Sequence, residues 1–127
     1  MSDLAWVNQK IQQHAQEDLS VKVILQFQIT AEDDTALIGK LKKHITKQIH
    51  QDLIHFSEKL PHMDELITCL WESNTVTSTI FVCRSPYYTY QNIKPAVEQF
   101  FKRINEKIDD NIGIRVDWLL TQVQQNK

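Results

Sequence analysis

Three tyrosines and an arginine lie close together in one short segment of this chain. The stretch from Arg84 to Asn92 holds all three tyrosines of the sequence. Tyrosine and arginine contribute much of the binding energy at protein interfaces, because they bury large, rigid, amphipathic surfaces. We therefore expect another protein to be the partner, bound by Arg84, Tyr87, Tyr88 and Tyr90. The alternative is that one or two of the tyrosines anchor the segment to the core while their hydroxyl groups reach water.

A row of lysines offers a second kind of binding chemistry. Lys40, Lys43 and Lys47 recur at helical spacing, opposite the apolar stripe of the same predicted helix. They favour nucleic-acid binding as the alternative function, although such a row is more commonly a solvated helix face. The net charge of −2 does not by itself favour a nucleic acid or a membrane surface, so this role depends on a local patch. The strand predicted over 75–84 lacks the usual RNA-binding consensus and offers only Phe81 for base stacking.

A group of four histidines raises the question of a metal site. His44 and His55 share a face of the predicted helix, but eleven residues separate them by about 16 Å of axial rise. His50 points elsewhere, and no two of these histidines, His62 included, have the spacing of three or four residues that chelation from one helix requires. We therefore expect solvated histidines, with no metal and no cofactor.

Signs of catalysis are few in the sequence. With two glycines in total, the chain has no phosphate-binding loop, no dinucleotide fingerprint and no nucleophile elbow. Cys83 beside Arg84, or His62 with Asp64, would be the reactive groups of a small enzyme with no recognisable motif, but nothing joins them into a nucleophile and its base. We therefore expect a non-catalytic protein-binding module. Inhibitors, immunity or antitoxin-like factors and regulatory subunits are often of this kind.

The two cysteines bear on the cellular compartment. Cys69 and Cys83 fall on the two arms of a predicted hairpin, and a turn centred on Asn74 would place Cys69 opposite Thr79. A disulfide would then need a shifted register, so we expect two free, buried thiols. No charged-then-apolar leader and no apolar run near the ~18 residues of a spanning helix are present. These features predict a cytoplasmic protein with no membrane partner.

Hydrophobic periodicity predicts the elements that position these residues. Alternation predicts strands at 21–30, 66–72, 75–84 and 112–120, and helical spacing predicts helices from about 33 to 60 and from about 93 to 108. This order is typical of an α+β, ferredoxin-like βαββαβ sandwich, with a four-stranded antiparallel sheet and two helices on one face. We expect one domain over 1–127, with the βαββαβ unit at 21–120, a further N-terminal helix at 1–18 and a frayed tail at 121–127.

The open face of this sheet is the last candidate surface. Strand parity places Ile24, Phe81 and Leu119 on it, and a turn centred on Asn74 would add Ile67 and Trp71. Such a face suits either a homodimer contact or coverage by the N-terminal helix, and we favour coverage. An edge of the sheet or a partner are the other positions open to that helix.

Overall fold

The computed structural model describes residues 3–17, 19–33, 35–57, 70–74, 78–83, 88–108 and 113–123. The elements follow one another as α1 (Asp3–Gln16), β1 (Ser20–Ala31), α2 (Ala36–Ser57), β2 (Leu70–Ser73), β3 (Ser78–Cys83), α3 (Tyr90–Lys107) and β4 (Ile114–Gln122). All strand pairs are antiparallel, and the sheet has the order β2-β3-β1-β4. Within these residues the predicted α+β fold of four antiparallel strands and three helices is confirmed. The strand order does not by itself confirm the ferredoxin-like arrangement.

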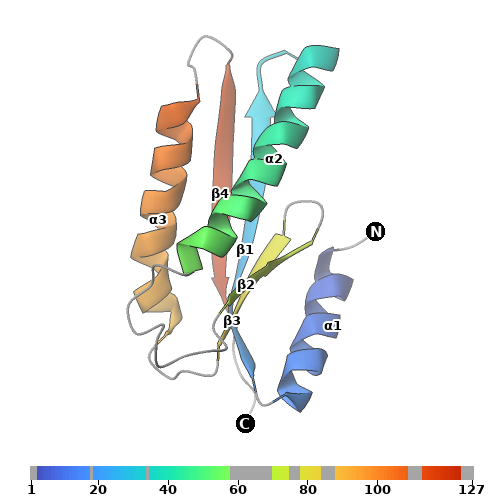
Figure 1. The fold of residues 1–127 in the computed structure, drawn as a ribbon, viewed down its shortest axis with the longest axis vertical. Coiled ribbons are helices and arrows are strands. Elements are labelled where there is room, and N and C mark those ends of the chain that lie inside the picture. Colours follow the sequence, from blue (N-terminus) through green and yellow to red (C-terminus); the bar gives the residue numbers. More distant parts are fainter. Residues whose placement is uncertain are drawn as a thin grey trace.

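Helices α2 and α3 cover one face of the sheet together. Figure 1 shows α2 crossing in front of the strands and α3 running beside it. Ile93, Val97 and Phe101 recur every four residues along α3, and this row is fully buried. Below the helices lie Val23, Leu25 and Phe27, which alternate along β1 and belong to the same core.

Aromatic rings form the centre of this core. Phe101 stacks on Trp118 of β4, with ring centroids 5.6 Å apart and planes 11° apart. It also lies 6.2 Å from the ring of Phe27. Burying a side chain of this size contributes roughly 1.5–3 kcal/mol relative to leaving it in water. The packing of α3 on the sheet therefore depends strongly on Phe101.

Capping residues set where the two helices begin. The backbone N–H of Ile38 donates to the hydroxyl of Thr35 at 3.2 Å, so α2 begins at Ala36, later than the predicted start near 33. Thr89 caps α3 by accepting from the N–H of Asn92, so this helix begins three residues before the predicted Ile93. Residues 58–60, which the sequence predicts as the end of α2, lie outside the described residues.

Helix α1 packs on the opposite face, across β1 and β3. Val7 of α1 forms a second buried cluster with Val21, Ile80 and Val82, and Ile24 packs against it. This confirms coverage as the position of the N-terminal helix. In a regular strand Val21 would share a face with Val23, but a register irregularity between the two residues turns Val21 toward α1.

The pairing of β2 with β3 differs from the prediction. Ser73 pairs with Thr79, so the hairpin is not centred on Asn74, whose side chain instead accepts from the N–H of Ser78 at 3.1 Å. Trp71 pairs with Phe81, and both are buried in the core beneath α2 and α3 with centroids 5.0 Å apart. The placement of Phe81 and Trp71 on the open face is therefore wrong. Ile67 lies outside the described residues.

The cause of this error is that β3 is buried on both sides. Every residue of Ser78–Cys83 is buried, because β3 is a central strand covered on its two faces by different helices. A strand without a polar side carries no alternation from which its faces can be assigned.

Cys83 corrects the prediction of free thiols. Its side chain is completely buried and disulfide-bonded, and Cys69 is the one other cysteine in the sequence. The observed register pairs Leu70 with Val82, so the residues next to this pair are the two cysteines. The predicted turn position had made such a bridge look unreachable. Free thiols were one reason to predict a cytoplasmic location, and the disulfide removes that reason.

The outer edge of β4 is closed by a side chain of α3. The Asn105 amide donates to the carbonyl of Val116 and accepts from its N–H, both at 3.0 Å. This pair of bonds imitates the pairing of a neighbouring strand, which opposes edge-to-edge association at that point. At the start of β4, Gly113 has φ of 65°, the left-handed conformation that glycine adopts without strain.

Candidate functional site

The tyrosine-rich segment is divided between core and surface. Tyr88 is 2% exposed and packs edge-on against Phe81, with centroids 5.6 Å apart. Tyr90 is half-buried in the first turn of α3, with the Lys94 ammonium 5.8 Å from its ring centre. Tyr88 is therefore a core anchor and not a contact residue. Arg84 and Tyr87 lie outside the described residues, and a binding role for Tyr90 stays a prediction.

The three lysines proposed for nucleic-acid binding lie where the sequence placed them. Lys40, Lys43 and Lys47 are all exposed on α2, whereas Lys42, on the apolar side, is half-buried. Their side chains can reach a ligand on the outer surface of the helix.

Charge is divided unevenly between the helix layer, α2 with α3, and the rest of the chain. The layer carries eight lysines and arginines against three acids, a balance of +5. The whole chain carries −2, so the remaining residues together carry −7. A protein with almost no net charge thus has a local cationic surface, which bulk composition conceals.

A groove runs between the two helices of this layer. Its upper part has a volume of about 320 Å³ and its lower part about 330 Å³, and both parts share Asp52, Ile104 and Lys107. We call this feature the interhelical groove. Apolar side chains of both helices line it, including Ile45, Phe100 and Ile104.

Polar residues line both sides of the interhelical groove. On α2, His44, Gln48, Asp52 and His55 recur at spacings of four, four and three, which confirms that the two histidines share a face. On α3, Arg103 and Lys107 lie one turn apart. Asp52 accepts a hydrogen bond from the amide of Gln48 at 2.9 Å. Among the described residues, no ion pair joins Arg103 or Lys107 to an acid.

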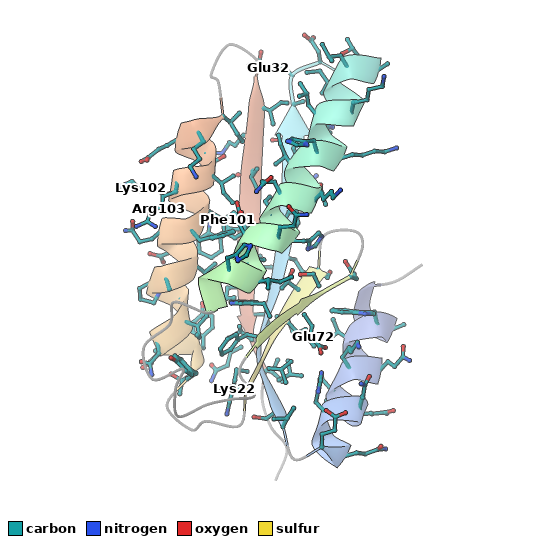
Figure 2. The ribbon with its side chains drawn as sticks, viewed as in Figure 1. Lys22, Glu32, Glu72, Phe101, Lys102 and Arg103 are labelled. Atoms are coloured by element: carbon teal, nitrogen blue, oxygen red, sulfur yellow. The ribbon has the colours of Figure 1, made fainter. Side chains whose placement is uncertain are left out.

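The sequence prediction overlooked Arg103 and Lys107. Their spacing of four residues was visible, but only the packing of α3 beside α2 shows that both line a shared groove. Figure 2 shows Phe101 directed from α3 toward the sheet, with Lys102 and Arg103 on the other side of the helix.

The remaining histidines have different surroundings. His50 is half-buried and lies edge-on to Phe27, with ring centroids 5.5 Å apart, and His62 lies outside the described residues. In the described part of the chain, no three histidine, cysteine or acidic side chains are grouped so as to hold a metal ion.

His14, which the sequence did not single out, joins α1 to the sheet. It is 4% exposed, and its Nε2 lies 2.8 Å from Oε2 of Glu72 on β2. Its Nδ1 lies 3.3 Å from Oε2 of Glu17, and Nζ of Lys10 is 3.7 Å from Oε2 of Glu72. Figure 2 shows Glu72 in the space between β2 and α1. This polar cluster holds α1 in place beside the apolar contact of Val7.

Comparison with protein-family models, with curated proteins and with solved structures finds no match. None of the described helices is both long enough and apolar enough to cross a membrane. The surface chemistry of the chain is therefore the basis on which function is inferred.

Proposed function

We propose that this protein is a non-catalytic module that binds nucleic acid on the outer surface of its helix layer. The observation that carries the proposal is the charge division, with +5 on α2 and α3 in a chain of net charge −2. Lysine and arginine that neutralise phosphates release condensed counterions, which supplies affinity without a sequence motif.

The sheet surface, which many RNA-binding domains of this kind use, is unsuitable here, and this supports binding on the helix layer. RNA-binding sheets of this kind stack bases on exposed aromatics of a central strand. Here Phe81 lies in the core, and α1 packs over Ile80 and Val82 on the other face of the same strand. A nucleic acid would therefore meet the helices rather than the sheet.

The test is the salt dependence of binding to a fluorescent oligonucleotide, followed by anisotropy. Affinity should fall steeply with salt. Replacing Lys40, Lys43 and Lys47 together by Gln should weaken binding and lower the salt slope by about one for each phosphate that is no longer neutralised. Arg115→Gln is the control, because Arg115 is exposed on β4, outside the helix layer, with its Nε 3.0 Å from Asp117. Equal effects of the triple variant and the control, or no binding at low salt, would contradict the proposal.

Protein binding through the tyrosine-rich segment, the first expectation from the sequence, has less support. One of its four residues is a core anchor, one is half-buried, and two lie outside the described residues. A homodimer through the open sheet face is also less favoured, since α1 occupies part of that face. Both stay predictions, as does a small enzyme without a motif.

For the fold, we infer the ferredoxin-like class. The order of helices and strands after α1, and the position of α2 and α3 on one face, support this assignment.

A further inference from the structure

We infer that the interhelical groove takes an unstacked base of a single-stranded nucleic acid, with its phosphates held by Arg103 and Lys107. This inference rests on the proposed function and adds the class of nucleic acid. It depends on three features of the groove: its size, its apolar lining and the charges along its sides.

The groove has the size for a nucleotide and not for a helix of nucleic acid. Each of its two parts, about 320 and 330 Å³, falls at the lower end of the roughly 300–1,000 Å³ that small-molecule sites occupy. The two parts share lining residues, so successive nucleotides can follow the groove along the helices. A duplex keeps its bases inside the stack and would contact only the lysines on the outer surface.

The lining offers a surface on which a base can pack. Phe100 is half-buried, with its ring edge-on to Phe101 at a centroid distance of 5.1 Å, and it lines the groove together with Ile104. Bases stack on aromatic side chains without regard to sequence, because every base has a π-face. A surface that binds only phosphates would not require this apolar lining.

The charges suit the phosphates that flank the base. Arg103 and Lys107 are about 6 Å apart along α3 and lie on the groove side. His44 and His55 face them from α2, and Asp52 is the one acid among the described residues that line the two parts. Arginine supplies a planar fork of donors that matches phosphate oxygens.

Adjacent residues of α3 provide a matched pair of variants. Arg103→Gln and Lys102→Gln each remove one positive charge from neighbouring positions of the helix, but only Arg103 lines the groove. Phe100→Leu keeps an apolar side chain while removing the ring. Circular dichroism and thermal melting establish that each variant is folded.

The experiment measures binding of the full chain to a labelled oligo(dT) strand, with an unlabelled duplex of equal length and poly-glutamate as competitors. We expect unlabelled oligo(dT) to compete better than either. Phe100→Leu should weaken binding about fivefold or more, as removal of one stacking partner does. Arg103→Gln should weaken it severalfold more than Lys102→Gln.

The outcomes separate this inference from the proposed function. Steep salt dependence with equal affinity for single strand and duplex, and no effect of Phe100→Leu, would leave the proposed function standing and overturn the inference. Poly-glutamate that competes as well as oligo(dT) would also overturn it, because the polypeptide has charge but no bases. Failure to bind any nucleic acid at low salt would overturn both.

Discussion

The two faces of the sheet are covered in different ways. On one face, α2 and α3 lie over a continuous core that contains Phe27, Phe81, Phe101 and Leu120. On the other, α1 covers a smaller cluster around Val7 and leaves Leu119 60% exposed. The helix layer is joined to the sheet by extensive apolar packing and by the hydrogen bonds of Asn105 to β4, whereas α1 combines a small apolar contact with the polar cluster of His14 and Glu72. We therefore expect the first face to supply most of the stability, and the fold to survive when the second face is weakened.

The strongest test of this difference is Phe101→Ala. The side chain is fully buried between α3 and the sheet, so its removal leaves a cavity and should lower the free energy of unfolding by about 3–5 kcal/mol. Leu119→Ala on the other face is the control and should change it by less than about 0.5 kcal/mol. Urea denaturation measures both. Similar losses in the two variants would show that the faces do not differ as described.

The disulfide of Cys83 ties the hairpin into the better-packed face. Breaking it with Cys83→Ala should cost about 3 kcal/mol, the value for a bridge that closes a loop of some 15 residues. Reduction of the wild type should lower its urea midpoint to that of Cys83→Ala, and reduction should leave the midpoint of the variant unchanged. Cys69→Ala should match Cys83→Ala if the two are partners. A wild-type midpoint insensitive to reductant would refute the disulfide.

His14→Ala tests the attachment of α1. The substitution removes the hydrogen bond to Glu72, and because Glu72 is partly exposed we expect a loss of only about 1–2 kcal/mol. Hydrogen exchange should quicken in α1 and remain slow in α3, which separates the two faces directly. His44→Ala, at an exposed position, is the control. Uniform acceleration throughout the protein would mean that α1 is not a separate unit.

Substitution of Lys22 should have the smallest effect on stability, and this effect should depend on pH. Partial burial lowers the pKa of Lys22 below the ordinary value of 10.5, because the charged form loses hydration in the folded protein. The charge therefore opposes folding wherever the lysine is protonated, and this penalty fades as pH rises through the folded pKa toward 10.5. Lys22→Met should melt slightly higher than the wild type at neutral pH, with the gap narrowing as the pH rises toward 10.5. A gap independent of pH would assign the effect to packing.

Prediction from sequence succeeded where an element has one buried side. The helix predicted over 93–108 has its apolar row on the sheet as expected, and β1 was placed within one residue at each end. Lys40, Lys43 and Lys47 were correctly assigned to solvent for the same reason. An amphipathic pattern directly records which side of an element is buried.

Prediction from sequence failed where both sides of an element are buried or where a feature is formed by two elements. The faces of β3 and the register with β2 depend on the turn and on α1, so Phe81 and Trp71 were assigned to the wrong face and the disulfide of Cys83 was missed. Tyr88 reaches the core from a segment whose composition favoured an interface. The interhelical groove could not be foreseen, since Arg103 and His55 become neighbours of one space only when α3 lies beside α2.

The order of helices and strands, the solvent-facing lysines and the apolar rows of α3 and β1 were determined by the sequence alone, because periodic hydrophobicity is a local property of the chain. The hairpin register, the burial of Tyr88, the disulfide of Cys83 and the cationic groove were decided by tertiary structure. Each of these depends on which distant segments pack together, and that is settled by the competition for buried surface across the whole molecule.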